Sequence, residues 1–196
     1  MTQIGLANDC DLPIRFQVLN LLSMPRCARE VRERLPGAKR KQIETTMHRL
    51  RDQGLIVCVT PMALQSRLYT RTALGDQLAS RLTGTQPGRV HTLNKDELDL
   101  RAWICAGRYR RLVLRVMDEP MTPKQIRRRV LPLYERISPN HVHGVLRDFA
   151  ARSIAQGDPW RHWRLTPLGR RLHDVETDGL PAMPRQSGWQ TNWGRR

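Results

Sequence analysis

Tyr69-Thr-Arg-Thr-Ala-Leu-Gly-Asp-Gln-Leu78 and Trp163-Arg-Leu-Thr-Pro-Leu-Gly-Arg-Arg-Leu172 are two versions of one ten-residue motif. The identical positions lie 94 residues apart: Thr72, Leu74, Gly75 and Leu78 match Thr166, Leu168, Gly169 and Leu172. The preceding segments also correspond, at a shift of 99 positions, where Leu50–Leu55 matches Phe149–Ile154. An internal repeat of this kind predicts two copies of one small folding unit.

Length and charge restrict what these two units can be. A chain of 196 residues can form two units of about 80–90 residues, each with its own core. The formal net charge is +16, divided as +7 in residues 1–96 and +9 in residues 97–196. A basic excess in both halves favours a polyanion as the partner. Thirty of the 34 basic residues are Arg. A GC-rich genome is an alternative explanation for that ratio, but it does not explain the net charge.

The cysteine pattern and hydropathy suggest an intracellular setting. Cys10, Cys27, Cys58 and Cys105 form no Cys-x-x-Cys pair, and neither a secretory leader nor a long apolar span is present. We therefore expect a cytoplasmic, nucleoid-associated protein that does not bind a membrane.

The periodicity of apolar residues places the main elements of both copies. Ile43, Met47 and Leu50 form one helical stripe in the first copy, and Val142, Leu146 and Phe149 form the equivalent stripe in the second. After the first stripe, residues 55–59 and 67–71 are expected to pair as a β-hairpin. The predicted domains are an N-terminal one (1–82), a linker (83–96), a C-terminal one (97–176) and a flexible basic tail (177–196).

Within each copy the predicted order is helix, helix, helix, hairpin, helix, and residues 39–51 are the third helix of the first copy. This order is that of the winged helix-turn-helix. The step from Gly54 to Leu55-Ile56 and the Thr-x-Leu-Gly start of the last helix resemble MarR- and PadR-like regulators over residues 14–82. This resemblance implies a mainly α fold with small β-hairpins, arranged as tandem winged helix-turn-helix domains. It also implies that the third helix of each copy is a recognition helix, which lies in the DNA major groove.

The outward face of the first recognition helix is basic at its start. We expect the DNA contacts of this copy to come from Lys39, Arg40, Lys41, Gln42, Thr45 and Arg49, with Arg67 on the hairpin. Cations at a helix N-terminus oppose the helix dipole, so their presence favours an external anion over an ordinary solvated face.

The corresponding face of the second copy has a different composition. Its expected DNA contacts are Asn140, His141, His143 and Arg147, with Arg161 and Arg164 on the hairpin. Gly144 lies inside this helix, where Gly costs roughly 1 kcal/mol relative to Ala. Either close approach of a ligand or tight packing against a neighbouring helix would explain it. Arg127-Arg-Arg129, on the preceding helix, is either a phosphate contact or a solvated face.

Catalytic and metal-binding patterns are missing from the sequence. His141 and His143 are spaced i, i+2, so on a helix they point to different sides and do not chelate easily. The sequence contains no Gly-rich phosphate loop, HExxH, GxSxG or nuclease-type carboxylate cluster. We expect no enzyme activity, no cofactor and no metal.

The favoured hypothesis is a sequence-specific double-stranded DNA-binding protein, most simply a transcriptional regulator. Because the two outward faces differ, the two half-sites should differ as well. A plasmid or phage replication-initiation or partition protein is one alternative. A chromosome-complex scaffold and an RNA-binding protein are two others, although the basic charge argues against the scaffold. Trp189 and Trp193 suggest a possible protein partner for the tail.

Overall fold

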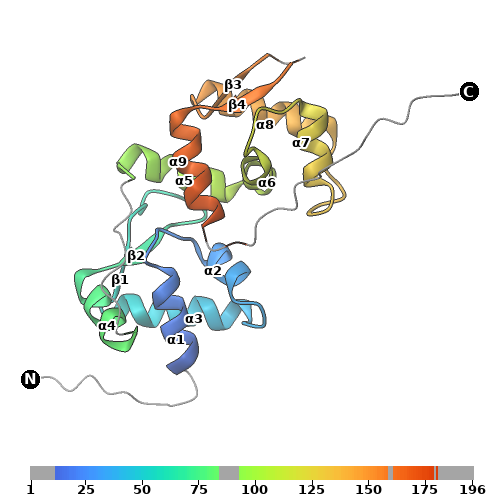
Figure 1. Ribbon diagram of the computed structural model, residues 1–196. Helices are drawn as coiled ribbons and strands as arrows, with labels where there is room; N and C mark the ends of the chain where they lie inside the picture. The colour runs from blue at the N-terminus through green and yellow to red at the C-terminus, as the bar shows by residue number, and fades with distance from the viewer. Residues whose placement is uncertain (1–11, 84–92, 159–160, 179, 181–196) are drawn as a thin grey trace, which may run out of the picture.

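A computed structural model describes residues 12–83, 93–158, 161–178 and 180 (Figure 1). This part of the chain is mainly helical with two small antiparallel hairpins, which confirms the predicted mainly α class. Trp160 and the tail residues Trp189 and Trp193 lie outside the described residues.

The same order of elements occurs in both halves. In the first half these are α1 (Leu12–Leu21), α2 (Ala28–Arg34), α3 (Arg40–Asp52), β1 (Ile56–Cys58), β2 (Tyr69–Arg71) and α4 (Ala73–Thr83). The second half begins with an additional helix, α5 (Lys95–Ala106). It continues with α6 (Arg108–Val116), α7 (Pro123–Val130), α8 (Pro139–Ala151), β3 (Ala155–Gly157), β4 (Trp163–Leu165) and α9 (Pro167–Thr177).

Each hairpin also pairs with a residue just before a helix, which is α2 in the first half and α7 in the second. In the first hairpin Cys58 lies opposite Tyr69, and Tyr69 forms a further bridge with Arg26. In the second, Gly157 lies opposite Trp163, and Trp163 bridges to Met121. The hairpin is therefore attached to the helical core at the same point in both halves.

The threonine of the repeated motif closes the end of the preceding helix. The Thr72 hydroxyl donates to the Gly54 carbonyl (2.7 Å) and accepts from the Gly75 N–H (3.2 Å). The Thr166 hydroxyl donates to the Ser153 carbonyl (2.6 Å) and accepts from the Gly169 N–H (3.1 Å). Gly54 and Ser153 both have a positive φ, of 69° and 54°, so each is the left-handed residue that ends its helix.

The glycine of the motif permits a close backbone approach. A Cβ atom at Gly75 would overlap the carbonyl oxygen of Leu55, and one at Gly169 would overlap that of Ile154. The last helix of each half therefore packs directly on the backbone that leaves the third helix. The repeated Thr and Gly therefore have the same structural role in both copies, which is to fix the last helix against the end of the third helix.

Each half has its own hydrophobic core. Ile43, Met47 and Leu50 are buried in the first core, and Leu146 and Phe149 are buried in the second, as their helical stripes predicted. A third apolar cluster joins the halves. It contains Cys27 and Leu68 from the first half and Leu93, Leu98, Ala102, Cys105 and Val175 from the second.

Charged residues, four of them buried, extend this contact between the halves. We call Glu30, Glu33, Arg101, Arg111, Arg115 and Glu176 the interface cluster, which joins α2 to α5, α6 and α9. Arg101 pairs with Glu30 and also with Glu176 (3.3 Å), and all three side chains are buried. Figure 1 shows α2 directly below α5 and α6 at the junction of the two halves.

Each of the three arginines in the interface cluster contacts two carboxylates. Arg111 donates to both carboxylate oxygens of Glu33 (2.9 Å each) and to Glu176 (2.9 Å). Arg115 contacts the same two carboxylates, at 2.5 Å for Glu33 and 2.7 Å for Glu176. Burial alone would raise the pKa of Glu30, but the neighbouring Arg101 and Arg111 outweigh burial and lower it to about 2. Paired charges of this kind fix a relative orientation, because any other orientation leaves them unpaired.

Helices α5 and α9 and their contacts extend beyond the predicted domain limits. Asn94 caps α5 by accepting from the Glu97 N–H (2.9 Å), so the end of the predicted linker belongs to a helix. At the other boundary, α9 continues through Thr177, and Asp178 forms an ion pair with the buried Arg26 (2.5 Å). The start of the predicted tail is therefore part of the contact between the halves.

Candidate nucleic-acid interface

The start of α3 combines positive charge with an uncapped helix end. Its N-cap residue is Lys39, whose side chain forms no capping hydrogen bond within the described structure, and the first turn contains no acidic residue. The remaining predicted contacts on this face, Arg40, Lys41, Gln42, Thr45 and Arg49, are all exposed. A helix N-terminus with free backbone N–H groups and basic side chains favours an anion.

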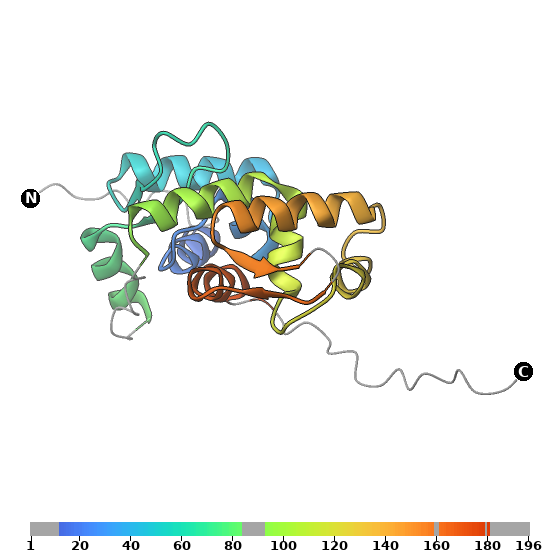
Figure 2. The same cartoon turned by 90° about the horizontal axis from the view of Figure 1, so that it is seen from above.

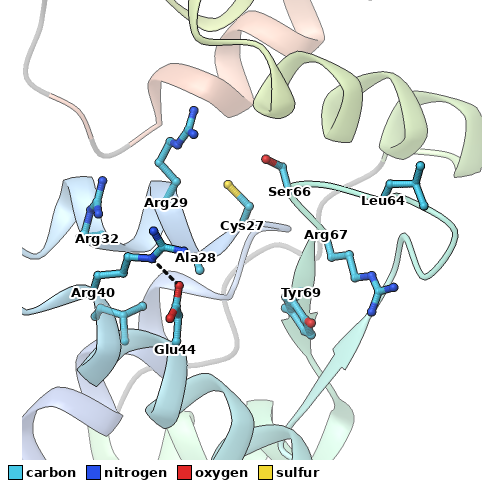
Figure 3. A pocket seen from close by; sticks show the side chains of 11 residues that line it. Cys27, Ala28, Arg29, Arg32, Arg40, Glu44, Leu64, Ser66, Arg67 and Tyr69 are labelled. Carbon is cyan, nitrogen blue, oxygen red and sulfur yellow. Dashed lines mark hydrogen bonds and ion pairs between the residues drawn. The ribbon is translucent and has the colours of Figure 1, made fainter.

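A groove of about 490 Å³ lies between α2, α3 and the loop that joins β1 to β2. Four arginines line it, and we call it the arginine groove: Arg29, Arg32, Arg40 and Arg67. Glu44 is the one carboxylate in the lining, and it pairs with Arg40 at 2.7 Å. Figure 3 shows the α2 and α3 arginines on one side of the groove and Arg67 on the other.

The sequence interpretation missed two of these arginines. Arg29 and Arg32 belong to α2, the helix before the predicted recognition helix. The corresponding helix of the second copy was considered for phosphate contacts because of its Arg127-Arg-Arg129 run. Applying the same reasoning to α2 would have found both residues.

The Arg127-Arg-Arg129 run itself is largely engaged within the protein. Arg129 pairs with Asp118 and Glu119, and the Arg127 Nε donates to the Ile137 carbonyl (3.1 Å). These contacts account for two of the three arginines without an external ligand.

The start of α8 differs from that of α3. Ser138 caps the helix by accepting from the His141 N–H (3.2 Å), and its own N–H donates to the His141 Nδ1 (3.2 Å). The His141 ring also stacks on Tyr109, with 4.1 Å between ring centroids. His141 therefore stabilises this helix end, a role that its sequence position alone did not indicate.

The other predicted contacts of the second half remain accessible. Asn140, Arg147, Arg161 and Arg164 are exposed, and His143 is half-buried. A Cβ atom at Gly144 would meet no atom within 4 Å, so packing against a neighbouring helix does not explain this glycine.

The two predicted recognition helices lie toward the same side of the molecule. In Figure 2, α3 and α8 both lie in the upper part of the view, whereas α9 lies below them.

One group of possible metal ligands occurs among the described residues, away from the predicted histidines. Cys27, Glu30 and Cys105 are buried with their ligand atoms within 4.8 Å of one another. The hydrogen bond with Cys27, together with burial, holds the pKa of Cys105 well above its usual range. Arg101 already pairs with Glu30, and its positive charge opposes a cation, so we assign the group to the packing between the halves.

No family model, curated protein or solved structure matches this chain. The helices in the described ranges are all too short or too polar to span a membrane.

Proposed function

We propose that the chain is a sequence-specific double-stranded DNA-binding protein, most simply a transcriptional regulator. The arginine groove is the observation that supports this proposal most directly. It places four guanidinium groups beside the uncapped start of α3, in a chain of net charge +16. Guanidinium groups bind phosphates and the guanine edge through paired hydrogen bonds.

Each half, in this proposal, is a winged helix-turn-helix domain. The repeated order of three helices, a hairpin and a helix supports it, as do the bridges from Arg26 to Tyr69 and from Met121 to Trp163. In this arrangement α3 and α8 are the recognition helices, and the β1–β2 and β3–β4 hairpins are the wings.

The two proposed recognition helices present different side chains. The α3 surface presents Lys39, Arg40 and Lys41, whereas the α8 surface presents Asn140 and Arg147 around a capped helix start. We therefore propose an operator of two different half-sites rather than a palindrome.

Selection of bound duplexes from a random pool, followed by footprinting, tests the proposal. The wild-type chain should protect two adjacent segments, and its affinity should fall steeply with salt, because bound counterions are released from DNA. Arg40→Ala with Lys41→Ala should weaken binding by at least about tenfold, since a good base contact contributes about 1–3 kcal/mol.

A matched control removes equal charge outside the groove. Arg81→Ala with Lys95→Ala takes two exposed cations from α4 and α5 and should change affinity much less. Protection of a single short segment, or equal losses in the two double variants, would contradict the proposal.

Replication-initiation and partition proteins would use the same DNA-binding surface, and gene neighbourhood distinguishes them from a regulator. Competition by structured RNA at equal or better affinity than duplex DNA would instead indicate the RNA-binding alternative.

A further inference from the structure

The β1–β2 loop exposes two large apolar side chains. Met62 is 88% exposed and Leu64 is 96% exposed, whereas the next most exposed large apolar residue of the described chain, Leu82, is 56% exposed. Met62 and Leu64 lie two positions apart on one short loop, and exposed apolar residues grouped in this way mark an interaction site more often than isolated ones do.

Hydrogen bonds among the neighbouring residues Thr60, Ala63, Arg67 and Leu68 connect the two sides of this loop. The buried Thr60 accepts through its hydroxyl from the Leu68 N–H (2.8 Å) and through its carbonyl from the Ala63 N–H (3.1 Å). The Arg67 Nε donates to the Ala63 carbonyl (3.1 Å). Leu68, at the end of the loop, is fully buried in the third apolar cluster, so the loop is anchored there to the rest of the protein.

The described residues of the corresponding loop in the second half differ in character. Its β3–β4 loop presents Asp158, Arg161 and His162, all polar and exposed.

The surroundings of the tip indicate what it contacts. Leu64 lines the arginine groove together with Arg29, Arg32 and Arg67, a surface that attracts a polyanion (Figure 3). Phosphates offer nothing to an apolar side chain. Apart from the sugars and the thymine methyl groups in the major groove, the apolar surface of duplex DNA is the faces of its bases, which a side chain reaches only where a base step opens. Leu, Met and Pro are residue types that insert into such steps and kink the duplex.

We propose that Met62 and Leu64 insert between base pairs of duplex DNA bound in the arginine groove, and that they unstack one step and bend the duplex. This inference rests on the proposed function. It assigns the first wing to deformation of DNA, whereas α3 and α8 read its sequence.

The test uses the full chain and a duplex obtained by selection with the wild-type protein. Fluorophores at the two duplex ends report bending through energy transfer, and 2-aminopurine placed at successive positions reports unstacking. The wild-type chain should shorten the end-to-end distance and raise 2-aminopurine emission at one step. Met62→Ala with Leu64→Ala should abolish both signals, and because both side chains are exposed this variant should fold.

Two further double variants separate the possible outcomes. Leu82→Ala with Leu133→Ala removes exposed apolar surface elsewhere and should bend the duplex as the wild type does. Arg40→Ala with Lys41→Ala should reduce the amount of complex, while the complex that forms should still be bent.

Binding by the wild type without bending or unstacking would overturn the proposed insertion of Met62 and Leu64 and leave the proposed function intact. Normal bending by the Met62/Leu64 variant would also overturn it. Absence of wild-type binding to any duplex would overturn both proposals. Loss of a dimer on changing Met62 and Leu64, with bending unaltered, would assign the tip to a second copy of the chain instead.

Discussion

Gly75 and Gly169 occupy positions where a side chain would meet backbone rather than a flexible neighbour. A Cβ atom there would overlap the carbonyl oxygen of Leu55 or Ile154, which are both buried residues. We expect Gly75→Ala and Gly169→Ala each to lower the free energy of unfolding by about 1–3 kcal/mol, the usual cost of overpacking. Urea denaturation measures this, and an unchanged midpoint would contradict the close approach.

Gly144 lies inside a helix with open space around it, so the same substitution should have the opposite effect. Gly144→Ala should raise the free energy of unfolding by up to roughly 1 kcal/mol, because Ala loses less backbone entropy in a helix. If α8 approaches DNA at this point, the same variant should bind its operator more weakly. A more stable protein with unchanged DNA affinity would exclude contact at Gly144.

At the scale of elements, one buried carboxylate of α9 is shared by three arginines of α5 and α6. Glu176 contacts Arg101, Arg111 and Arg115, and it is fully buried. Glu176→Gln removes the charge that these guanidinium groups share. It should lower the free energy of unfolding by up to about 3–5 kcal/mol, as measured by urea denaturation, because only Glu30 and Glu33 then remain to compensate three guanidinium groups.

An exposed ion pair of the same chemistry is the control for this variant. Glu44 pairs with the exposed Arg40 on α3, so Glu44→Gln should cost less than about 1 kcal/mol. Equal costs for the two variants would show that the interface cluster contributes no more than a surface ion pair.

The same contacts make stability depend on pH. In the folded chain the pKa of Glu30 is about 2, below its ordinary value of 4.5. A depressed carboxyl pKa stabilises the folded state above the unfolded pKa, and this contribution is lost as the pH falls from 4.5 to about 2. The free energy of unfolding should therefore decline over this window, and Glu30→Gln should flatten that decline. An equal slope in the variant would contradict the role assigned to Glu30.

At the scale of the whole molecule, the third apolar cluster and the interface cluster hold the two halves in one orientation. The predicted recognition helices therefore have one separation. Each base pair added between the half-sites shifts the second site by about 3.4 Å and also rotates it. We expect a single added base pair to reduce binding toward that of one half-site alone, as measured by gel shift. Tolerance of several spacings would indicate that the halves move independently.

Local interactions determined what could be predicted from the sequence. The Thr-x-Leu-Gly helix starts, the buried stripes of α3 and α8 and the two hairpins all follow from residues close together in the chain, and the structure contains each of them. Capping, helical periodicity and strand alternation act over a few residues, so a single sequence reveals them.

The docking of the halves was decided only by tertiary structure. Glu30, Arg101 and Glu176 resemble ordinary surface charges in the sequence, and their burial depends on partners 71 to 75 residues away. The arginine groove is similar, because Arg29 and Arg67 come together only when the hairpin folds beside α2. The sequence alone therefore determined two copies of one scaffold. Long-range pairing of charges, which no local pattern records, decided how the copies are joined and which arginines share a surface.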